Sequence, residues 1–588
     1  MQKRSILNSA NKKSDIVRLR LNTGYARVSF FANRVDGLNV LRTMARCIVW
    51  FFVVVRFVAP GHSVCAEDSY DVVVYGGTSG GVAAAVQVAR MNKTVMLIEP
   101  SNHLGGLTSG GLGATDIGNK AAIGGISREF YQQVKKHYSQ PEAWTWQKKG
   151  EYKSYRNPDG SDDAMWTFEP HVAEKIFREM LRLNNVRFVM NERLDLRRGV
   201  IKNGKAIVEI RMESGRSYRA KRFIDATYEG DLLGTAGVSY HVGRESNDTY
   251  RETLNGIQTK NATKHQFVPN VSAYVVAGDA TSGLLPGVAA KGSGGQDGSG
   301  DHRVQAYCFR MCNTTHPANR IPFEKPDDYN ELNYELLLRN FESGAKIAPW
   351  HPINMPNHKT DTNNNGGFST DFIGMSYAWP EADYATRAKI YQQHLSYQKG
   401  LMWTLANHPR VPKAIRDEFS RWGNCRDEFV ENNGWPHQLY VREGRRMVGA
   451  LVMTQHHCQG KETVSDAVGL AAYTMDSHNV QRYVDEEGNA RNEGDVQVGG
   501  FPPYPISYRS IIPKASECSN LLVPIALSAS HIAYGSIRME PVFMVLGQSA
   551  ATAACQSIEN DKTVQQIDYQ SLKRRLVTDG QVLSWSQN

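Results

Sequence analysis

The clearest periodic pattern in the chain lies between residues 70 and 100. An almost continuous apolar run at 71–75 predicts a buried parallel strand, and a glycine-rich turn leads into the helical run "GVAAAVQVARM". A second apolar run at 94–99 predicts the next strand and ends in an acidic residue. Strand, glycine turn, helix and strand make a βαβ unit, whose turn binds the pyrophosphate of a dinucleotide at the helix N-terminus.

The glycine turn departs from the usual G-x-G-x-x-G spacing at its second glycine, where this chain has Thr78. Gly76 permits the tight turn, and Gly81 lets the helix pack closely against the sheet. The Cβ of Thr78 moves a phosphate slightly outward, and we expect its hydroxyl to compensate by donating a hydrogen bond to it. Glu99 is placed to accept hydrogen bonds from an adenosine ribose. The turn is therefore predicted to bind a dinucleotide.

The patterns that follow favour FAD over NAD. After the second strand comes a Gly/Ser/Thr-rich loop, 100–118, where an NAD-binding fold would continue with a helix. Such a loop suits a long ligand that lies close against the backbone. Helical spacing of apolar residues returns at 169–183, hairpins are predicted within 199–227, and a closing strand and helix within 520–555, with Pro541 in the first helical turn.

These elements predict an α/β fold, namely the FAD-binding Rossmann-like fold of two-dinucleotide-domain flavoproteins, with an inserted α+β substrate domain. The expected segments are a leader at 1–66, the two parts of the FAD-binding domain at 67–239 and 501–560, the insertion at 240–500 and a tail at 561–588. We expect the insertion to form a substrate-facing lid, because pockets form preferentially between domains.

The basic charge of the chain is confined to its first residues. Residues 1–66 hold eleven of the 68 Lys and Arg and two of the 59 Asp and Glu, so the formal net charge of +9 lies there and gives no support for a nucleic-acid partner. The apolar run 48–59, preceded by Arg46 and followed by small residues up to Ala66, is typical of a secretory signal peptide and too short for a membrane span. Met44 is then the expected start of the signal, and the mature chain is predicted to be periplasmic or secreted, without a transmembrane anchor. The alternative is an internal buried segment.

Six of the eight cysteines follow the leader. None forms a C-x-x-C pair, and no four cluster as an iron–sulfur or zinc site requires, so no metal site is predicted. Alternation through 304–312 predicts a strand that carries Cys308 and Cys312. The spacing leaves open whether, and how, the six cysteines pair.

Several motifs together resemble one family. They are the opening "GGT", "EPSNHLGG", "FIDATYEGDL", "YVREGRRMVG", "MDSH" and "SIRMEPVFMVLGQ". From about Tyr70 to about Ser557 the chain resembles the secreted or periplasmic FAD-dependent oxidoreductases of environmental bacteria, some of which carry a xanthan lyase label. Its flavin half is also similar to the flavin-binding subunit of heterodisulfide reductases, but it lacks a cysteine motif for an iron–sulfur cluster.

The resemblance implies that FAD is the cofactor. The residues expected at it are Gly76, Gly77, Thr78, Ser79, Gly80, Gly81, Glu99, Pro100, His103, Gly105, Gly106, Ala226, Thr227, Gly230, Asp231, Met539 and Glu540. Glu540 has a second interpretation, as a cap of the closing helix. Two residues depart from the usual pattern: Thr78 replaces a glycine of the turn, and Tyr228 replaces the glycine of an Ala-Thr-Gly ending of the return strand. They support an alternative in which the protein binds FAD without catalysing a reaction.

The expected reaction removes a hydride from an alcohol or amine carbon of a small polar substrate, such as a sugar or sugar acid, and an electron acceptor of unknown identity completes it. This oxidation needs a base and groups that anchor the substrate. The candidate bases are His478 and His531, and the candidate anchors are Arg446, Arg509 and Arg538. For each of them the alternative is a purely structural role. The rival function is a carbohydrate lyase or hydrolase built on the same scaffold.

Overall fold

A seven-stranded sheet forms the centre of the cofactor half. The computed structural model describes residues 69–156 and 159–586, so the predicted leader lies outside the described residues. The strands of this sheet are β1 (Ser69–Tyr75), β2 (Val95–Ile98), β3 (Arg187–Val189), β4 (Val200–Asn203), β5 (Ala206–Arg211), β6 (Ser217–Asp225) and β20 (Leu521–Leu522). They run in the order β3-β2-β1-β6-β5-β4, with β20 paired to β6. The pairs among β1, β2, β3, β6 and β20 are parallel, and β4, β5 and β6 form the predicted hairpins.

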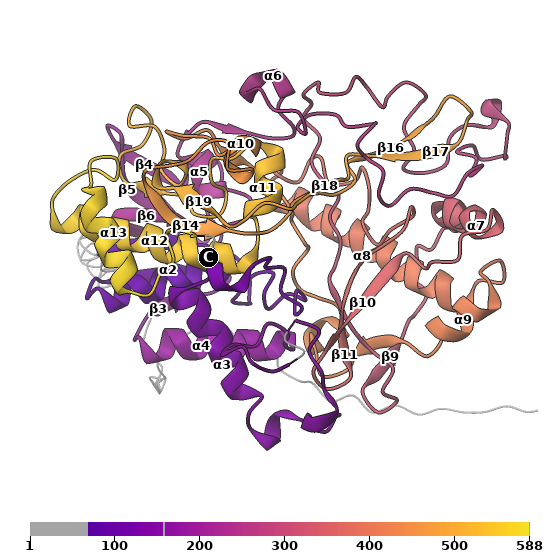
Figure 1. The fold of residues 1–588 in the computed structure, drawn as a ribbon, viewed down its shortest axis with the longest axis horizontal. Coiled ribbons are helices and arrows are strands. Elements are labelled where there is room, and N and C mark those ends of the chain that lie inside the picture. The colour runs from indigo at the N-terminus through magenta and orange to yellow at the C-terminus, as the bar shows by residue number, and fades with distance from the viewer. Residues whose placement is uncertain (1–68, 157–158, 587–588) are drawn as a thin grey trace, which may run out of the picture. The chain divides into compact units, whose positions relative to one another are not determined.

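Helices from the two ends of the described chain cover this sheet together (Figure 1). The helices are α2 (Ser79–Arg90), α3 (Gly125–His137), α4 (Pro170–Leu183), α12 (Glu540–Glu559) and α13 (Tyr569–Thr578). Small residues let α2 and α12 touch: a Cβ at Gly80 would lie 2.7 Å from the carbonyl oxygen of Phe543, and one at Gly547 would overlap the carbonyl oxygen of Gly80. Pro541 lies in the first turn of α12, as predicted.

The inserted segment, residues 240–500, contains a second sheet and the longest helix of the described chain, α8 (Tyr384–Asn407). The sheet order is β10-β11-β8-β12-β9. Its strands are β8 (Met311–Thr314), β9 (Arg320–Pro322), β10 (Trp350–Met355), β11 (Lys359–Asn364) and β12 (Gly423–Cys425). The helices near it are α7 (Glu335–Glu342) and α9 (Lys413–Phe419). The outer limits of the insertion stay a prediction.

The remaining elements are short. They are α5 (Asp231–Thr235), β7 (Tyr240–His241), α6 (Asn247–Tyr250), β13 (Arg446–Met447), α10 (Gln455–Cys458), β14 (Ala467–Ala471), β15 (Met475–Ser477), β16 (Gln481–Val484), β17 (Ala490–Glu493), β18 (Val496–Val498), β19 (Tyr504–Ser507) and α11 (His531–Ile537).

One predicted strand is wrong. Residues 304–312 were expected to alternate between two faces, but only Met311 and Cys312 lie in a strand, β8, and the segment before it is irregular. Every residue from 304 to 314 is buried, so the apparent alternation did not separate a core face from a solvent face. Among the described helices, none is long and apolar enough to cross a membrane.

Candidate active site

A cavity of about 360 Å³ opens above the glycine turn. Of the residues predicted at the cofactor, it is lined by Gly76, Thr78, Glu99, Pro100, His103, Gly106, Thr227 and Asp231. The others do not line it: Gly77, Ser79, Gly80, Gly81, Gly105, Ala226, Gly230, Met539 and Glu540. The opposite wall comes from the inserted segment, with Trp379, Tyr384, Arg387, Tyr391 and His437. The two halves of the chain therefore build this cavity together.

The turn between β1 and α2 is fixed by backbone geometry. Gly76 has φ +102°, and a Cβ there would lie 2.6 Å from the carbonyl oxygen of Ala226. Thr78 is the N-cap of α2: its Oγ1 accepts from the N–H of Gly81 at 3.2 Å and donates to the carbonyl oxygen of Ala226 at 2.8 Å. The expected donation to a phosphate is therefore wrong, because the hydroxyl proton is already used within the protein. The remaining free N–H groups of the α2 N-terminus are still suited to a phosphate.

Glu99 is held as a hydrogen-bond acceptor in the cavity wall. Its Oε2 accepts from the N–H of Gly77 at 2.6 Å, and its Oε1 accepts from the N–H of Ser101 at 2.7 Å. Burial raises the pKa of this carboxyl, and the backbone donors oppose that rise. A carboxylate has about four lone-pair sites, so the two oxygens can accept further hydrogen bonds from a ribose. The turn and this carboxylate fit the ADP part of FAD.

Tyr228, the departure from the usual Ala-Thr-Gly ending of the return strand, connects the glycine-rich loop to α12. Its hydroxyl oxygen accepts from the N–H of Leu107 at 2.8 Å, and its O–H donates to Oε1 of Glu540 at 2.8 Å. The other oxygen of Glu540 accepts from the hydroxyls of Ser79 at 2.6 Å and Thr108 at 2.7 Å. Glu540 therefore joins the N-termini of α2 and α12, and it does not act as a backbone cap.

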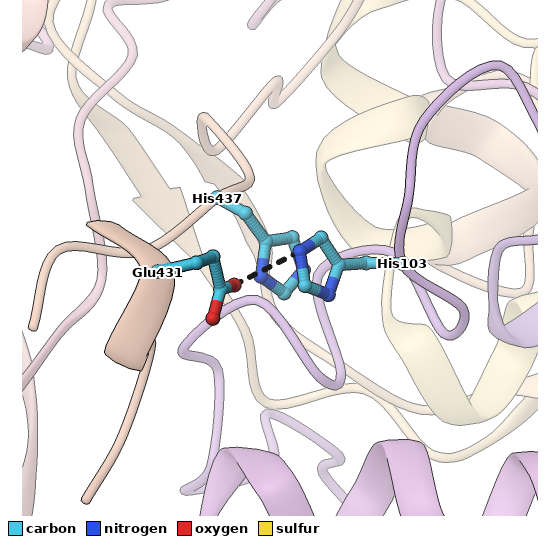
Figure 2. Close-up of side chains that lie close together, drawn as sticks. All are labelled: His103, Glu431 and His437. Atoms are coloured by element: carbon cyan, nitrogen blue, oxygen red, sulfur yellow. Dashed lines mark ion pairs between the residues drawn. The ribbon is translucent and has the colours of Figure 1, made fainter. Parts of the chain in front are cut away.

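His103 lies in the cavity wall between two acidic side chains, of which Figure 2 shows Glu431. Its Nδ1 is 3.1 Å from Glu174, its Nε2 is 3.0 Å from Glu431, and its ring stacks on His437 with centroids 3.7 Å apart and planes 9° apart. A metal ion must lie near the plane of each imidazole that binds it. Two rings stacked in parallel planes cannot share one ion, so this group is a carboxylate–imidazole pair that links the two halves of the cavity wall.

A second cluster of acidic residues and histidine surrounds a lysine. Nζ of Lys359 lies 2.8 Å from Glu169 and 2.7 Å from Glu428, and Glu428 also contacts His171 at 2.7 Å. Lys359 is fully buried, and these carboxylates raise the pKa of its ammonium. The protein's own cation therefore neutralises the carboxylates that a metal would need.

One of the two predicted bases, His478, belongs to a buried ion cluster. Its Nδ1 is 2.9 Å from Asp371, and the guanidinium of Arg442 is 2.8 Å from the other oxygen of that carboxylate. Burial, helped by Arg442, lowers the pKa of His478 below its ordinary value of 6.5. In the part of the chain that the structure describes, Nε2 has no hydrogen-bond partner, and the carboxylate of Asp476 lies 3.9 Å from it. This histidine is neutral at pH 7 and has one nitrogen free to accept a proton.

Three arginines surround the ring of Tyr440. Their guanidinium carbons lie 5.6 Å (Arg310), 4.6 Å (Arg442) and 5.8 Å (Arg538) from its centroid. Arg310 makes two 2.7 Å hydrogen bonds to the carboxylate of Asp361. Arg310 and Arg442 therefore each have a carboxylate partner. We call this group the arginine cluster: Arg310, Arg442, Arg538, Tyr440, Asp371 and His478.

Arg538 differs from the other two arginines. It donates to the hydroxyl of Tyr440 at 3.0 Å and to the carbonyl oxygen of Asp476 at 3.1 Å. Within the described ranges no carboxylate oxygen lies within 4.0 Å of it, whereas its Nε, like that of Arg442, is buried without a hydrogen-bond partner. A buried donor without a partner is costly unless a ligand or water satisfies it. Arg538 is therefore the arginine of the cluster that is available to a substrate.

The other predicted chemical residues have charged partners within the protein, although the Nε of Arg446, like that of Arg538, has no hydrogen-bond partner. His531 uses both ring nitrogens, with Nδ1 2.8 Å from Glu443 and Nε2 3.1 Å from Ser477. Arg446 is buried and paired with Glu245 at 2.7 Å. Arg509 pairs with Asp466 at 3.0 Å, and its side chain is 47% exposed. None of the contacts of Arg509 includes a residue of the arginine cluster.

Two cavity residues on the inserted segment were not predicted from the sequence. Arg387 makes two hydrogen bonds to Asp231, at 2.6 and 2.8 Å, so the carboxylate predicted to face the cofactor is engaged by α8. Trp379 donates its indole N–H to Glu229 at 3.0 Å and thereby faces the cavity. No local signal marks either residue. Tyr440 and Arg442 did stand in a quoted motif, "YVREGRRMVG", without an assigned role.

Comparisons with known proteins identify the family. The chain matches the model of a family described as FAD dependent oxidoreductase over residues 71–576. No curated protein matches it significantly. The similar solved structures include NikD, an unusual amino acid oxidase essential for nikkomycin biosynthesis (14% identity, 31% of this chain, 57% of that chain, TM-score 0.20). A second is OxyS anhydrotetracycline hydroxylase from Streptomyces rimosus (9% identity, 30% of this chain, 36% of that chain, TM-score 0.20). A third is a flavin-containing monooxygenase from Stenotrophomonas maltophilia (15% identity, 33% of this chain, 45% of that chain, TM-score 0.18).

The matched part of the chain spans between about a third and somewhat more than half of these solved chains. Their low TM-scores carry no argument about the reaction. The family match covers most of the chain, and the glycine turn and Glu99 fit an ADP-containing cofactor. The chain therefore belongs to the FAD dependent oxidoreductase family, and it is an α/β flavoenzyme whose cofactor is FAD.

Proposed function

We propose that the protein oxidises a small polar substrate, such as a sugar or sugar acid, at an alcohol or amine carbon, with His478 as the base. One observation carries this proposal: a neutral imidazole, fixed at Nδ1 by Asp371, keeps an unpartnered Nε2, and Asp476 is a neighbour both of this nitrogen and of Arg538, the arginine that lacks a carboxylate partner. The side chain of His478 is 11% exposed, so it is largely but not completely enclosed.

No side chain of the arginine cluster lines the cavity, but two of its members follow or precede residues at the cofactor site in the sequence, which supports a role near the cofactor. Tyr440 directly follows Leu439, which lines the cavity, and Arg538 directly precedes Met539, the N-cap of α12. Within the cavity, the glycine turn and Glu99 would hold the ADP part of FAD. When bound, FAD supplies the acceptor for the hydride. The protein must then supply a base and an anchor for the substrate.

His478 supplies the base in this proposal. Nδ1–H donates to Asp371, which leaves the lone pair of Nε2 to take the proton of a substrate O–H or N–H. The carboxylate of Asp371 stabilises the imidazolium that forms, and Arg442 keeps that carboxylate ionised: the pKa of Asp371 lies far below its ordinary value despite burial. Arg538 would hold substrate hydroxyls or a carboxylate through its Nε–H.

The first experiment compares visible spectra before and after substrates are added without oxygen. The chain from Glu67 is purified with FAD and mixed with neutral sugars and with the corresponding sugar acids. Loss of the flavin colour with one of them supports the proposed oxidation and identifies the substrate class. A substrate that is consumed without loss of colour would instead support the lyase or hydrolase alternative.

The second experiment tests the base. His478→Gln should keep bound FAD and slow the reduction by about 10²–10⁴-fold. His351→Gln, a change at an exposed histidine, is the matched control and should leave the rate unchanged. In the unmodified protein kcat/KM should fall as the pH decreases through the lowered pKa of His478, below 6.5, because the base becomes protonated. Reduction that is equally fast in His478→Gln would overturn the assignment.

A further inference from the structure

Two cysteines lie side by side in the five-stranded sheet of the inserted segment. Cys312 lies on β8 and Cys425 lies on β12. The two strands are antiparallel, with Asn424 opposite Asn313. The next pair in the same register places Cys425 opposite Cys312. Residues opposite one another in an antiparallel pair point to the same face of the sheet. Their Sγ atoms are accordingly 3.6 Å apart.

The two thiols are enclosed by the protein, with apolar side chains on one side and the buried pair of Lys359 and Glu428 nearby. Both residues are fully buried, and they form a small core cluster with Met355 and Phe429. Burial raises the pKa of both thiols, so neither is available as a thiolate once the sheet has formed. Cys308, Cys458, Cys518 and Cys555 are also buried and unpaired, and no sulfur–sulfur contact is recorded for them in the described ranges.

The geometry points to a disulfide between Cys312 and Cys425, formed while the sheet assembles. The separation of 3.6 Å between the two sulfur atoms must shorten to the usual S–S length of about 2.05 Å when the bond forms. The two thiols lose two protons and two electrons and form one S–S bond. The oxidant is another disulfide, either that of a disulfide oxidoreductase or glutathione disulfide, and it takes up these protons and electrons and becomes two thiols. The reacting thiolate must exist before burial, so the bond forms during folding.

The proposed bond would close a long loop. The chain between the two cysteines contains β10, β11 and α8, and α8 supplies Tyr384 and Arg387 to the cofactor cavity. A cross-link removes conformational freedom from the unfolded chain and so favours the folded state, more for longer loops. The proposed disulfide would hold together the two ends of the segment that contains α8, which contributes to the cavity wall.

The test counts thiols after folding in a glutathione redox buffer. The chain from Glu67, which holds the whole compact unit with its six cysteines, is denatured, reduced, refolded with excess glutathione disulfide and then alkylated under denaturing conditions. The expected result is four alkylated cysteines and one cross-linked peptide pair that contains Cys312 and Cys425. The oxidised protein should melt about 4 °C higher than the reduced protein.

Two variants make the result specific. Cys518→Ser removes a buried cysteine without a sulfur neighbour and should keep both the cross-link and the shift in Tm. Cys425→Ser should lose both, and Cys312→Ser should behave like it. If these two variants do not fold, the peptide map of the unmodified protein decides. Six alkylated cysteines after oxidative refolding, or a cross-link between any other pair, overturns the proposal, and neither outcome depends on FAD or on the proposed reaction.

Discussion

The glycine turn and the arginine cluster are built in opposite ways. The turn uses consecutive residues and mainly backbone: Gly76 allows a close approach to Ala226, and Thr78 caps α2. The arginine cluster uses side chains from residues 310 to 538, and its charges compensate one another across that separation. A change in the turn therefore acts through steric overlap, whereas a change in the cluster acts through a buried charge that loses its partner.

The difference has a consequence for function. Backbone donors and a positive φ bind a constant group, the diphosphate, in every member of a cofactor-binding family. Side-chain charges can be exchanged without moving the backbone, so they can set the substrate. The four changes that follow test this division, beginning with the one expected to abolish cofactor binding and ending with the smallest effect.

Gly76→Ala should remove bound FAD. The new Cβ would meet the backbone of Ala226 at 2.6 Å, in a conformation that costs roughly 3 kcal/mol for a residue with a side chain. That is about a hundredfold in affinity. Flavin absorbance per protein measures the loss. Gly204→Ala is the matched control, because Gly204 also has a positive φ, +57°, but nothing lies within 4 Å of its Cβ position. Equal flavin content in both variants would contradict the steric argument.

Arg442→Met should lower the free energy of unfolding by about 3–5 kcal/mol, because it leaves the carboxylate of Asp371 buried without its cation. Urea unfolding measures the change. Lys413→Ala breaks an exposed pair with Asp417 and should cost less than about 0.5 kcal/mol. If the two variants were equally stable, the arginine cluster would not depend on charge compensation.

His394→Leu should weaken the acid sensitivity of the protein. Burial lowers the pKa of His394 to about 4, against an ordinary value of 6.5, although Asp371 acts in the opposite direction. Between these values the unfolded chain binds a proton that the folded chain does not, so stability is lost as the pH falls from 6.5 toward 4. The loss from this group is about 3 kcal/mol over the whole range, of which about 2 kcal/mol falls between pH 7 and pH 5. Urea midpoints at pH 7 and pH 5 in both proteins measure it, and an unchanged difference would refute the assignment.

Thr78→Gly should have the smallest effect. It restores the usual glycine spacing but removes the cap of α2, at a cost of a few tenths of a kcal/mol, whereas Thr78→Ala should cost about 1 kcal/mol. Both variants should keep FAD, since the hydroxyl of Thr78 is used by Ala226 and Gly81. An increase in FAD affinity beyond tenfold in Thr78→Gly would show that the threonine Cβ displaces the phosphate.

The turn could be predicted because its determinants are local. Apolar runs, glycine positions and the terminal Glu99 lie within one short stretch, and their periodicity identifies strand, turn and helix without knowledge of the rest. The hydrogen bonds of Thr78 and Glu540 could not be predicted in the same way. Their partners, Ala226 and Ser79, come from elements far away in the chain, so both residues have structural roles that spacing alone does not reveal.

The arginine cluster shows the same limit more strongly. Local motifs selected His478 and Arg538 but also Arg509, which is paired with Asp466 and has a half-exposed side chain. Only packing decides which arginine meets a carboxylate and which is left without one. The neutral state of His478 likewise depends on burial and on Arg442, which lies far from it in the sequence.

The sequence by itself therefore determined the cofactor class, the βαβ unit and the closing helix α12, because backbone conformation and helix or strand periodicity are set by neighbouring residues. The tertiary structure decided that α8 of the inserted segment forms a wall of the cofactor cavity, that Arg538 is the arginine without a carboxylate partner, and that Cys312 faces Cys425. These facts depend on which distant side chains come together and exclude water, and burial then changes the energies of their charges and thiols.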